Sequence, residues 1–464
     1  MLNMSRSRSD RASRRTFALL SAAAAAGTSL LVAQQRADAQ TWVNPNSGSW
    51  SVGTNWIGGV PPVSGATTAL QFNATGSQAY SSFNNIATGF VLNTLTTSNS
   101  STGAITVTGQ SLGGGAGTSG PSVIVNSTGT GSSVVNMGGT VYSLRVQQGL
   151  LDISGASFTV ASTQRQNDTL AGLNDGRWGL NVGEVSGQSA RFIMSGGTLI
   201  GNSGFVGVAD GSDGAATFSN GANFSTGASG RFGVNSGTGA ISILSGAQVT
   251  SRLVDVGRQG DPTFPSPGSI SASLTIDGAN SKITSAQLVL PRFAGNASLT
   301  ISNGASWVGQ AFDTIAGNTF TSSYQGSTST ATVTGTGSSL VIPGTFITSG
   351  GAASAAGDPY GAGATSFTVS NGAQVKAQSF NIGQNNTGVT NLVADGTNTL
   401  ISSAGVGAGT GGFSMAGNLG AAGVGGPATV SNVTFRNGAQ GNFPGGISSG
   451  IRFNSTTDPN SGGG

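Results

Sequence analysis

Apolar and polar residues alternate in short runs over much of the chain, and each run ends in a turn. Ala190, Phe192 and Met194 lead into Gly196-Gly197, after which Leu199 resumes the alternation. An apolar period of two is the signature of a β-strand with one buried face. Glycine, alone or after Asn or Ser, tolerates the positive φ that lets the chain turn a corner. The pattern predicts strand–corner–strand units, whose corner glycines are Gly196, Gly221, Gly246, Gly304 and Gly372.

The units recur at similar but not fixed intervals. Gly196 and Gly221 are 25 residues apart, and so are Gly221 and Gly246. A second type of unit, with the pattern apolar-Thr-apolar-x-Gly-x-x-Ser/Thr-x-apolar, covers residues 274–283. Related copies at 333–340 and 392–400 indicate that two unit types interleave. Self-similarity of this length is typical of a repeat architecture.

After residue 40 the chain has no helix-period segment of useful length, so parallel strands must be connected without helices. A solenoid meets this condition, because each coil pairs strand to strand with the coil before it at about 4.8 Å. The sequence therefore predicts an all-β, right-handed parallel β-helix (β-solenoid) of about 15 coils and roughly 70 Å in length. An array of antiparallel β-sandwiches is the alternative, disfavoured because the repeat is shorter than a sandwich domain.

Residues 1–39 have the three-part layout of an export signal. Five arginines near the start precede an Ala-rich apolar run, and Ala37-Asp38-Ala39 forms a small-x-small cleavage site. The run Arg14-Arg15-Thr16-Phe17 resembles a twin-arginine motif, which favours that route over general secretion. A transmembrane anchor is the alternative, but the apolar run is short and weakly apolar for a span. We expect an exported protein, in the periplasm, at the outer surface or outside the cell, with no membrane span in the mature chain.

The composition excludes several classes of function. Charged residues are only 7% of the chain, and six of its 18 lysines and arginines precede residue 40. The remaining residues carry 12 basic and 13 acidic side chains, so we expect no basic patch for nucleic acid. The chain has no Cys and no His, which excludes disulfides, thiolate metal sites and a catalytic triad built on an imidazole.

Three tryptophans, Trp42, Trp50 and Trp56, follow the signal within residues 40–75. The end of a solenoid exposes strand edges and an open core, and we expect these indoles to form an N-terminal cap over it. An aromatic face that binds carbohydrate is the alternative. The spacing W-x5-GSW-x4-NW-x-GG-x-P resembles the start of many autotransporter-like passenger domains.

The repeat carries a second resemblance. Residues 299–305 are LTISNGA and residues 332–338 are TVTGTGS. Together they resemble the repeat shared by type V secreted proteins and proteins with a PEP-CTERM sorting tail, over roughly residues 180–400. This chain shows neither the C-terminal barrel of the first group nor the Pro-Glu-Pro tail of the second, so the resemblance predicts no mode of anchoring. We expect solenoid repeats over 76–440 and a flexible Gly/Ser/Asn-rich tail over 441–464.

Few side chains suggest catalysis or metal binding. Asp210 and Asp213 flank Gly211-Ser212 and are candidates to share a Ca²⁺ ion. The full calcium-loop spacing is missing, however, and a solvated turn is favoured. Arg191 near Glu184 is expected to form an ordinary surface pair.

Two further features argue against an enzyme. Acidic residues after the signal are mostly isolated, whereas glycoside hydrolysis needs two convergent carboxylates. Polysaccharide lyases usually cluster basic residues on one sheet, but Lys282 and Lys376 are far apart in the sequence. We therefore expect no catalytic residue, no cofactor and no metal site.

The sequence favours an exported extracellular or cell-surface protein, a structural or adhesin-like β-solenoid without catalytic activity. Its Ser/Thr/Asn-rich faces offer hydrogen bonds to surface glycans or to other cell-surface proteins. One alternative is a carbohydrate-binding or polysaccharide-active β-helix. Another is a spacer that holds a further domain away from the cell.

Overall fold

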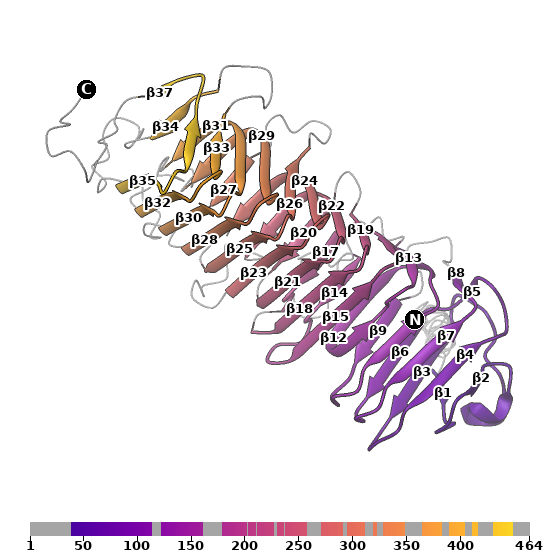
Figure 1. Ribbon diagram of the computed structural model, residues 1–464. Coiled ribbons are helices and arrows are strands. Elements are labelled where there is room, and N and C mark those ends of the chain that lie inside the picture. Colours follow the sequence, from indigo (N-terminus) through magenta and orange to yellow (C-terminus); the bar gives the residue numbers. More distant parts are fainter. Residues whose placement is uncertain are drawn as a thin grey trace, which may run out of the picture.

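The protein is a rod of stacked parallel strands (Figure 1). The computed structural model describes residues 39–113, 122–160, 179–201, 203–209, 211–226, 230–235, 237–257, 271–290, 295–310, 319–322, 328–348, 364–382, 389–403, 411–415 and 430–448. Within these residues the chain forms 37 strands of one continuous system and two short 3-10 turns. Ala39 is the first described residue, and the predicted signal residues Arg14, Arg15, Phe17 and Ala37 lie outside the described part.

The strands form three parallel ladders, which the chain visits in the same order in every coil. Ladder 1 contains β1 (Gln40–Trp42), β3 (Ala69–Ala74), β6 (Thr94–Asn99), β9 (Ser122–Asn126), the first half of β12 (Ser143–Asp152), β14 (Leu180–Val182), β17 (Ser203–Val206), β20 (Arg231–Val234), the second halves of β22 (Gln248–Val256) and β24 (Lys282–Leu290), β27 (Thr319–Ser322), the second halves of β29 (Ser339–Thr348) and β31 (Gln374–Ile382), β34 (Phe413–Met415) and β37 (Ile447–Ser448).

Ladder 2 contains β2 (Gly48–Ser49), β4 (Tyr80–Asn84), β7 (Ile105–Gly109), β10 (Ser133–Asn136), the second half of β12, β15 (Ser189–Ser195), β18 (Asp213–Ser219), β21 (Thr238–Leu244), β23 (Ser271–Asp277), β25 (Asn296–Ser302), β28 (Thr328–Thr334), β30 (Ala364–Ser370), β32 (Val389–Asp395) and β35 (Val430–Arg436). Ladder 3 contains β5 (Phe90–Val91), β8 (Leu112–Gly113), β11 (Gly139–Val141), β13 (Ser157–Val160), β16 (Thr198–Ile200), β19 (Asn223–Ser225), the first halves of β22 and β24, β26 (Ser306–Gly309), the first halves of β29 and β31, β33 (Leu400–Ser402) and β36 (Gln440–Asn442).

The predicted parallel β-solenoid is confirmed, and the sandwich array is wrong. Every ladder pairing between the described strands is parallel, whereas sandwich sheets are antiparallel. Ladder 1 has 15 rungs, which at about 4.8 Å per step give a rod of about 67 Å. The right hand of the coil stays a prediction.

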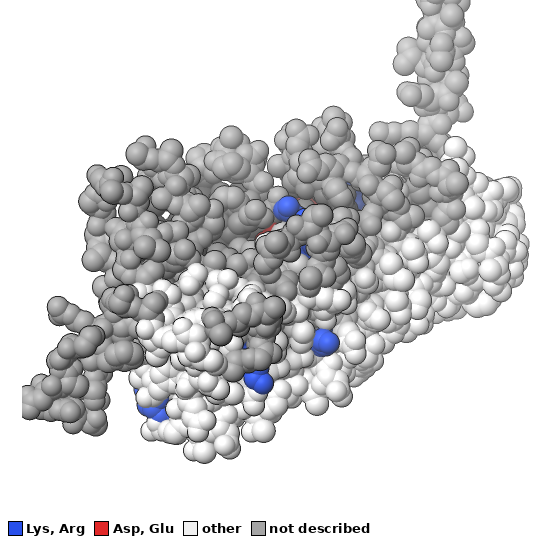
Figure 2. Space-filling view, turned by 90° about the horizontal axis from the view of Figure 1, so that it is seen from above, with Lys and Arg blue, Asp and Glu red and all other residues white. Residues whose placement is uncertain are grey.

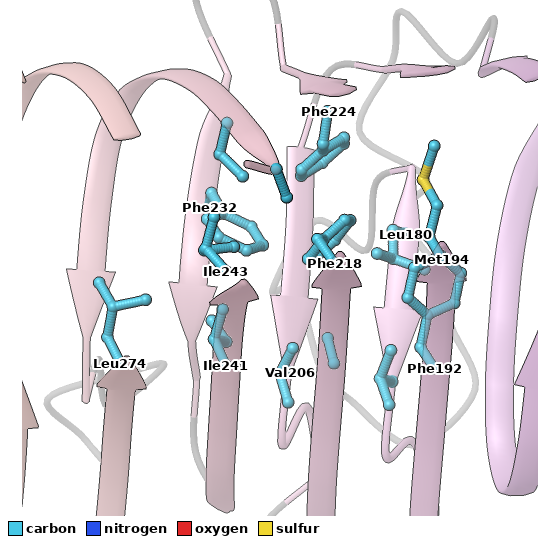
Figure 3. Close-up of a cluster of buried hydrophobic side chains, with 14 of the residues drawn as sticks. Leu180, Phe192, Met194, Val206, Phe218, Phe224, Phe232, Ile241, Ile243 and Leu274 are labelled. Carbon is cyan, nitrogen blue, oxygen red and sulfur yellow. The ribbon is translucent and has the colours of Figure 1, made fainter. Parts of the chain in front are cut away.

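The core is a continuous apolar column inside the three ladders. Alternate residues of each strand point inward, so Phe192 and Met194 stack on Ala216 and Phe218 in the next coil. Figure 3 shows this column from Phe192 to Leu274. The Phe218 ring lies 5.4 Å from Phe224 across the core, between ladders 2 and 3. Each coil therefore buries its apolar side chains against its own other strands and against the neighbouring coils.

The irregular spacing of the repeats comes from the connections of ladder 1. Connections from ladder 2 to ladder 3 contain two to five residues in every complete coil. The long connections, such as Val160 to Leu180, Val256 to Ser271 and Thr348 to Ala364, all begin or end at ladder 1. Because loop length costs little free energy, extra residues are tolerated there without disturbing the stacking.

The three tryptophans fill the N-terminal end of the core. Trp42, Trp50 and Trp56 are 2%, 0% and 2% exposed, and the Trp56 ring meets the other two edge-to-face at 5.1 and 6.0 Å. Trp42 lies in β1, while Trp56 joins η1 (Gly53–Asn55) to η2 (Ile57–Gly59) and folds back to form an antiparallel bridge with Trp42. Burial of this kind suits a cap and leaves no indole face for a sugar.

Strands extend beyond both predicted boundaries of the repeat region. β1 and β3 already belong to ladder 1, so the coils begin at Gln40 rather than at residue 76. At the other end β36 and β37 continue the ladders to Ser448, within the predicted tail of 441–464. The reason is Phe443, whose ring packs 4.6 Å from Phe413 and holds this Gly-rich segment against the core. No helix in the described part of the chain is long and apolar enough to cross a membrane.

We predict that Trp56→Ala destabilises the first coils by about 3–5 kcal/mol, because it empties the centre of the aromatic cap. Stability in a solenoid is a sum of local terms, so hydrogen exchange measured by mass spectrometry should accelerate over residues 40–110 and stay unchanged over 271–382. Val63→Ala, at a side chain 74% exposed, is the control and should have no effect. Uniform acceleration along the rod would contradict the local role of the cap.

Candidate functional surface

From Ser195 onward the corner between ladders 2 and 3 is built in two forms, and these are the two unit types of the sequence. The four-residue corner is Ser302-Asn303-Gly304-Ala305, with φ of 54° at Asn303 and 80° at Gly304 and a hydrogen bond from Ala305 N to Ser302 O at 3.1 Å. Positive φ at both central residues defines a type I′ turn. The five-residue corner, such as Asp277–Ser281, has positive φ at Gly278 and Asn280 instead. The predicted corner glycines Gly196, Gly221, Gly246, Gly304 and Gly372 all lie at this edge, with φ between 71° and 82°.

The two corner forms bond to each other where they alternate along the rod. The buried hydroxyl of Ser281 accepts a hydrogen bond from Gly246 N at 2.9 Å and donates to Asp277 O at 2.6 Å. Ser338 and Thr399, at the same place in the next five-residue corners, accept from the N–H groups of Gly304 and Gly372. A hydroxyl can do both because it is a donor and an acceptor.

Each five-residue corner is also hydrogen-bonded to the following coil, where an asparagine side chain donates to the first residue of the corner. Asn303 Nδ2 donates to Asp277 Oδ1 at 2.6 Å, and Asn437 Nδ2 donates to Asp395 Oδ1 at 2.7 Å. Arg436 also donates to Asp395, and these bonds hold the pKa of that carboxyl below its usual value. The polar side chains at this edge of the rod are thus used in hydrogen bonds between successive coils, so the edge has a structural role.

The outer face of ladder 2 carries a regular array of hydroxyl groups. Over four consecutive strands two outward columns contain only Ser and Thr: Ser273, Thr275, Ser298, Thr300, Thr330, Thr332, Ser366 and Thr368. Neighbours in a column are about 4.8 Å apart, and the two columns are about 7 Å apart. Ser298 Oγ donates to Ala272 O at 3.5 Å, and the other seven hydroxyls bond to no group among the described residues. We call these eight residues the hydroxyl array.

Charged side chains cluster in the middle of the rod, and none of the predictions from the sequence included this cluster. Residues 39–144 contain none, and the first is Arg145. Arg145 Nε donates to both carboxylate oxygens of Glu184, at 3.0 and 2.9 Å, and the Glu184 side chain is 2% exposed. The sequence did contain a signal for this cluster, because charged residues appear only after the long uncharged stretch of residues 39–144.

The expected pair between Arg191 and Glu184 is wrong, because each residue has another partner. Arg191 Nη2 donates to Asp213 Oδ2 at 2.6 Å, in the next coil, and both side chains are about half exposed. This hydrogen bond from Arg191 holds the pKa of Asp213 below its usual value, against the opposing effect of partial burial. Asp210, the other half of the calcium candidate, lies outside the described residues.

The described acidic residues do not form a convergent pair at this cluster. Glu184 lies just after β14, whereas Asp255 lies in β22, three rungs farther along ladder 1. Three steps are about 14 Å, more than the separation of about 5–9.5 Å between the two carboxylates of a glycosidase. In the described part of the chain no three His, Cys, Asp or Glu residues are close enough to hold a metal ion.

Lys282 and Lys376 do not meet either. Both lie on the outer face of ladder 3, in strands β24 and β31, which are three rungs apart. In Figure 2 the described surface is mostly white, with few Lys and Arg side chains. Comparison with protein-family models, with curated proteins and with solved structures gave no match for this chain.

We predict that Ser338→Ala lowers the free energy of unfolding by about 1 kcal/mol, because Gly304 N–H loses its acceptor. Thr336→Ala, two residues earlier at an exposed position of the same corner, should change it by less than about 0.5 kcal/mol. Denaturant unfolding of the two variants measures both values. Equal losses of unfolding free energy in the two variants would mean that the hydrogen bond to the Ser338 hydroxyl does not stabilise the corner.

We also predict that Arg191→Gln raises the pKa of Asp213 toward its ordinary value. The folded-state pKa is lowered, so the pair stabilises the protein above pH of about 4 and this contribution is lost as the pH falls through the folded pKa. The contribution is below about 0.5 kcal/mol, since the pair is half exposed and screened by solvent. A carboxyl-carbon NMR titration checks the shift, and Arg436→Gln, which should move only Asp395, is the control.

Proposed function

We propose that this chain is an exported, rod-shaped module of the cell surface, which acts as a structural or adhesive element and binds neutral polysaccharide through the hydroxyl array. The array carries the proposal, because its hydroxyls are regularly spaced and seven of the eight bond to no group among the described residues. The predicted N-terminal export signal and the repeat resemblance support the same location.

The rigidity of the rod makes weak contacts useful. A single hydroxyl bond to a sugar contributes only about 0.5–1.5 kcal/mol net. Eight hydroxyls held on four paired strands need no ordering when a polymer binds, so their contributions combine along one chain. An isolated loop with the same residues would lose most of this gain to conformational entropy.

The charge pattern supports a neutral partner. The two columns of the array contain no charged residue, and the adjacent corner carries Asp277 with its carboxylate already bonded to Ser302 and Asn303. A charged polymer would find no opposite charge on these columns, whereas sugar hydroxyls match hydroxyl groups as donors and acceptors.

We predict that the mature chain co-sediments with at least one of microcrystalline cellulose, chitin or curdlan, and that 1 M NaCl leaves binding intact because no ion pair is involved. The triple variant Thr275→Val, Thr300→Val, Thr332→Val should lose at least about tenfold in affinity, since valine keeps the shape and strand preference but not the hydroxyl.

The matched control is Thr198→Val, Thr250→Val, Thr284→Val, which removes three hydroxyls from the outer face of ladder 3. This variant should bind like the wild type. Equal loss in both triple variants, or no binding to any of the three polymers, would refute the hydroxyl array as the binding surface. Soluble reducing sugar released from the polymer would show instead a polysaccharide-active enzyme.

A further inference from the structure

The sequence contains four Asn-Gly steps, and all of them lie at four-residue corners between ladders 2 and 3. They are Asn220-Gly221, Asn303-Gly304, Asn371-Gly372 and Asn437-Gly438. In every one the asparagine and the glycine have positive φ, between 52° and 84°. The alanine that follows donates its N–H across each corner at 3.0 or 3.1 Å. The four steps are therefore alike in local sequence and in conformation.

An Asn-Gly step can lose ammonia without an enzyme. Hydroxide removes the proton of the glycine amide, the amide nitrogen attacks the asparagine Cγ, and the side-chain nitrogen leaves as ammonia. Water then opens the cyclic imide at either carbonyl, which gives aspartate or isoaspartate. Glycine favours the attack because it has no Cβ to obstruct the approach. The reaction needs an accessible glycine N–H and a corner that can open, so the hydrogen bonds at each step control its rate.

At three of the four steps the following coil binds the glycine N–H. Gly221 N donates to Ser245 O at 3.3 Å, and Gly304 N donates to Ser338 Oγ at 3.0 Å. Gly372 N donates to Thr399 Oγ1, also at 3.0 Å. A hydrogen-bonded amide gives up its proton only when the structure around it opens. Stacking of the coils therefore protects these three steps.

The fourth step, Asn437-Gly438, lacks this protection. It follows β35, the last strand of ladder 2 in the described part of the chain. Gly438 N–H bonds to no group among the described residues, and both residues of the step are exposed. The contact with the preceding coil is intact, since Asn437 donates to Asp395 just as Asn303 donates to Asp277. Only the hydrogen bond to a following coil is missing.

We infer that Asn437 is a modification site, which converts spontaneously to aspartate or isoaspartate while the other three Asn-Gly steps stay intact. Conversion replaces an amide that donates to Asp395 with a carboxylate, so two negative charges then face each other beside Arg436. Isoaspartate also lengthens the backbone by one methylene, which a type I′ corner does not accommodate. The coil that contains β35 therefore loosens. This inference does not depend on the proposed function.

The test follows the four steps by peptide mapping and mass spectrometry while the mature protein is kept for days in mildly alkaline buffer. We expect Asn437 to convert about fivefold faster or more than Asn303 and Asn371, because its glycine lacks one hydrogen bond. In denaturant the four steps should convert at similar rates, since their local sequences are alike. Conversion of Asn437 in the folded protein that is no faster than that of Asn303 would overturn the inference.

Ser338→Ala tests the protecting hydrogen bond inside the rod. It removes the acceptor of Gly304 N–H, so conversion of Asn303 should rise by about fivefold, while Asn371 and Asn437 keep their rates. Thr336→Ala, at an exposed position of the same corner, is the matched control and should leave all four rates unchanged. An unchanged rate at Asn303 in Ser338→Ala would contradict protection by the following coil.

Hydrogen exchange of fresh and aged protein tests the consequence. Exchange should accelerate with age over residues 430–448 and stay unchanged over 271–302, because stability in a solenoid is local. Asn437→Gly tolerates the positive φ and has no amide to lose, so its exchange should not change with age. Equal exchange over 430–448 in fresh and fully converted wild-type protein would show that the modification does not loosen this coil.

Discussion

The structure depends on the pairing of each coil with the coils before and after it. A single coil satisfies almost none of its own backbone hydrogen bonds and cannot enclose an apolar interior. Stacking in parallel register solves both problems, since it pairs the backbone groups and places apolar side chains directly above one another. All other features of the rod are arranged so that this stacking continues without slipping.

Register is the vulnerable property of such a stack, because a shift by one residue would turn every apolar side chain outward. Hydrogen bonds at the corner between ladders 2 and 3 oppose such a shift in register. Ser281 bonds to the preceding corner, and Asn303 of the following coil bonds back to Asp277. The two corner forms are complementary, and they alternate from the corner at Leu244 to the corner at Ala439. Each five-residue corner in this part is therefore hydrogen-bonded to the corner of the preceding coil and to that of the following coil.

The same architecture divides the surface into parts with different uses. The corner after ladder 2 contains only two to five residues in every complete coil, and the paired strands of ladder 2 produce the even grid of the hydroxyl array. Ladder 1 receives the long connections, and the paired charges of Arg145 and Glu184 lie on its outer face. The first coil has no preceding coil to cover its core. The cluster of Trp42, Trp50 and Trp56 fills this end of the core instead.

The coils could be predicted from the pattern of residues alone. Alternation at Ala190, Phe192 and Met194 is local, and an Asn-Gly corner has few conformations, so strands, corners and parallel stacking follow from the pattern. Which polar residues pair with one another could be learned only from the folded protein. Arg145 and Glu184 are 39 residues apart, and Arg191 is much nearer to Glu184 in sequence but bonds to Asp213. The reason is that the connections at ladder 1 vary in length, so the distance along the chain does not report which side chains share a rung.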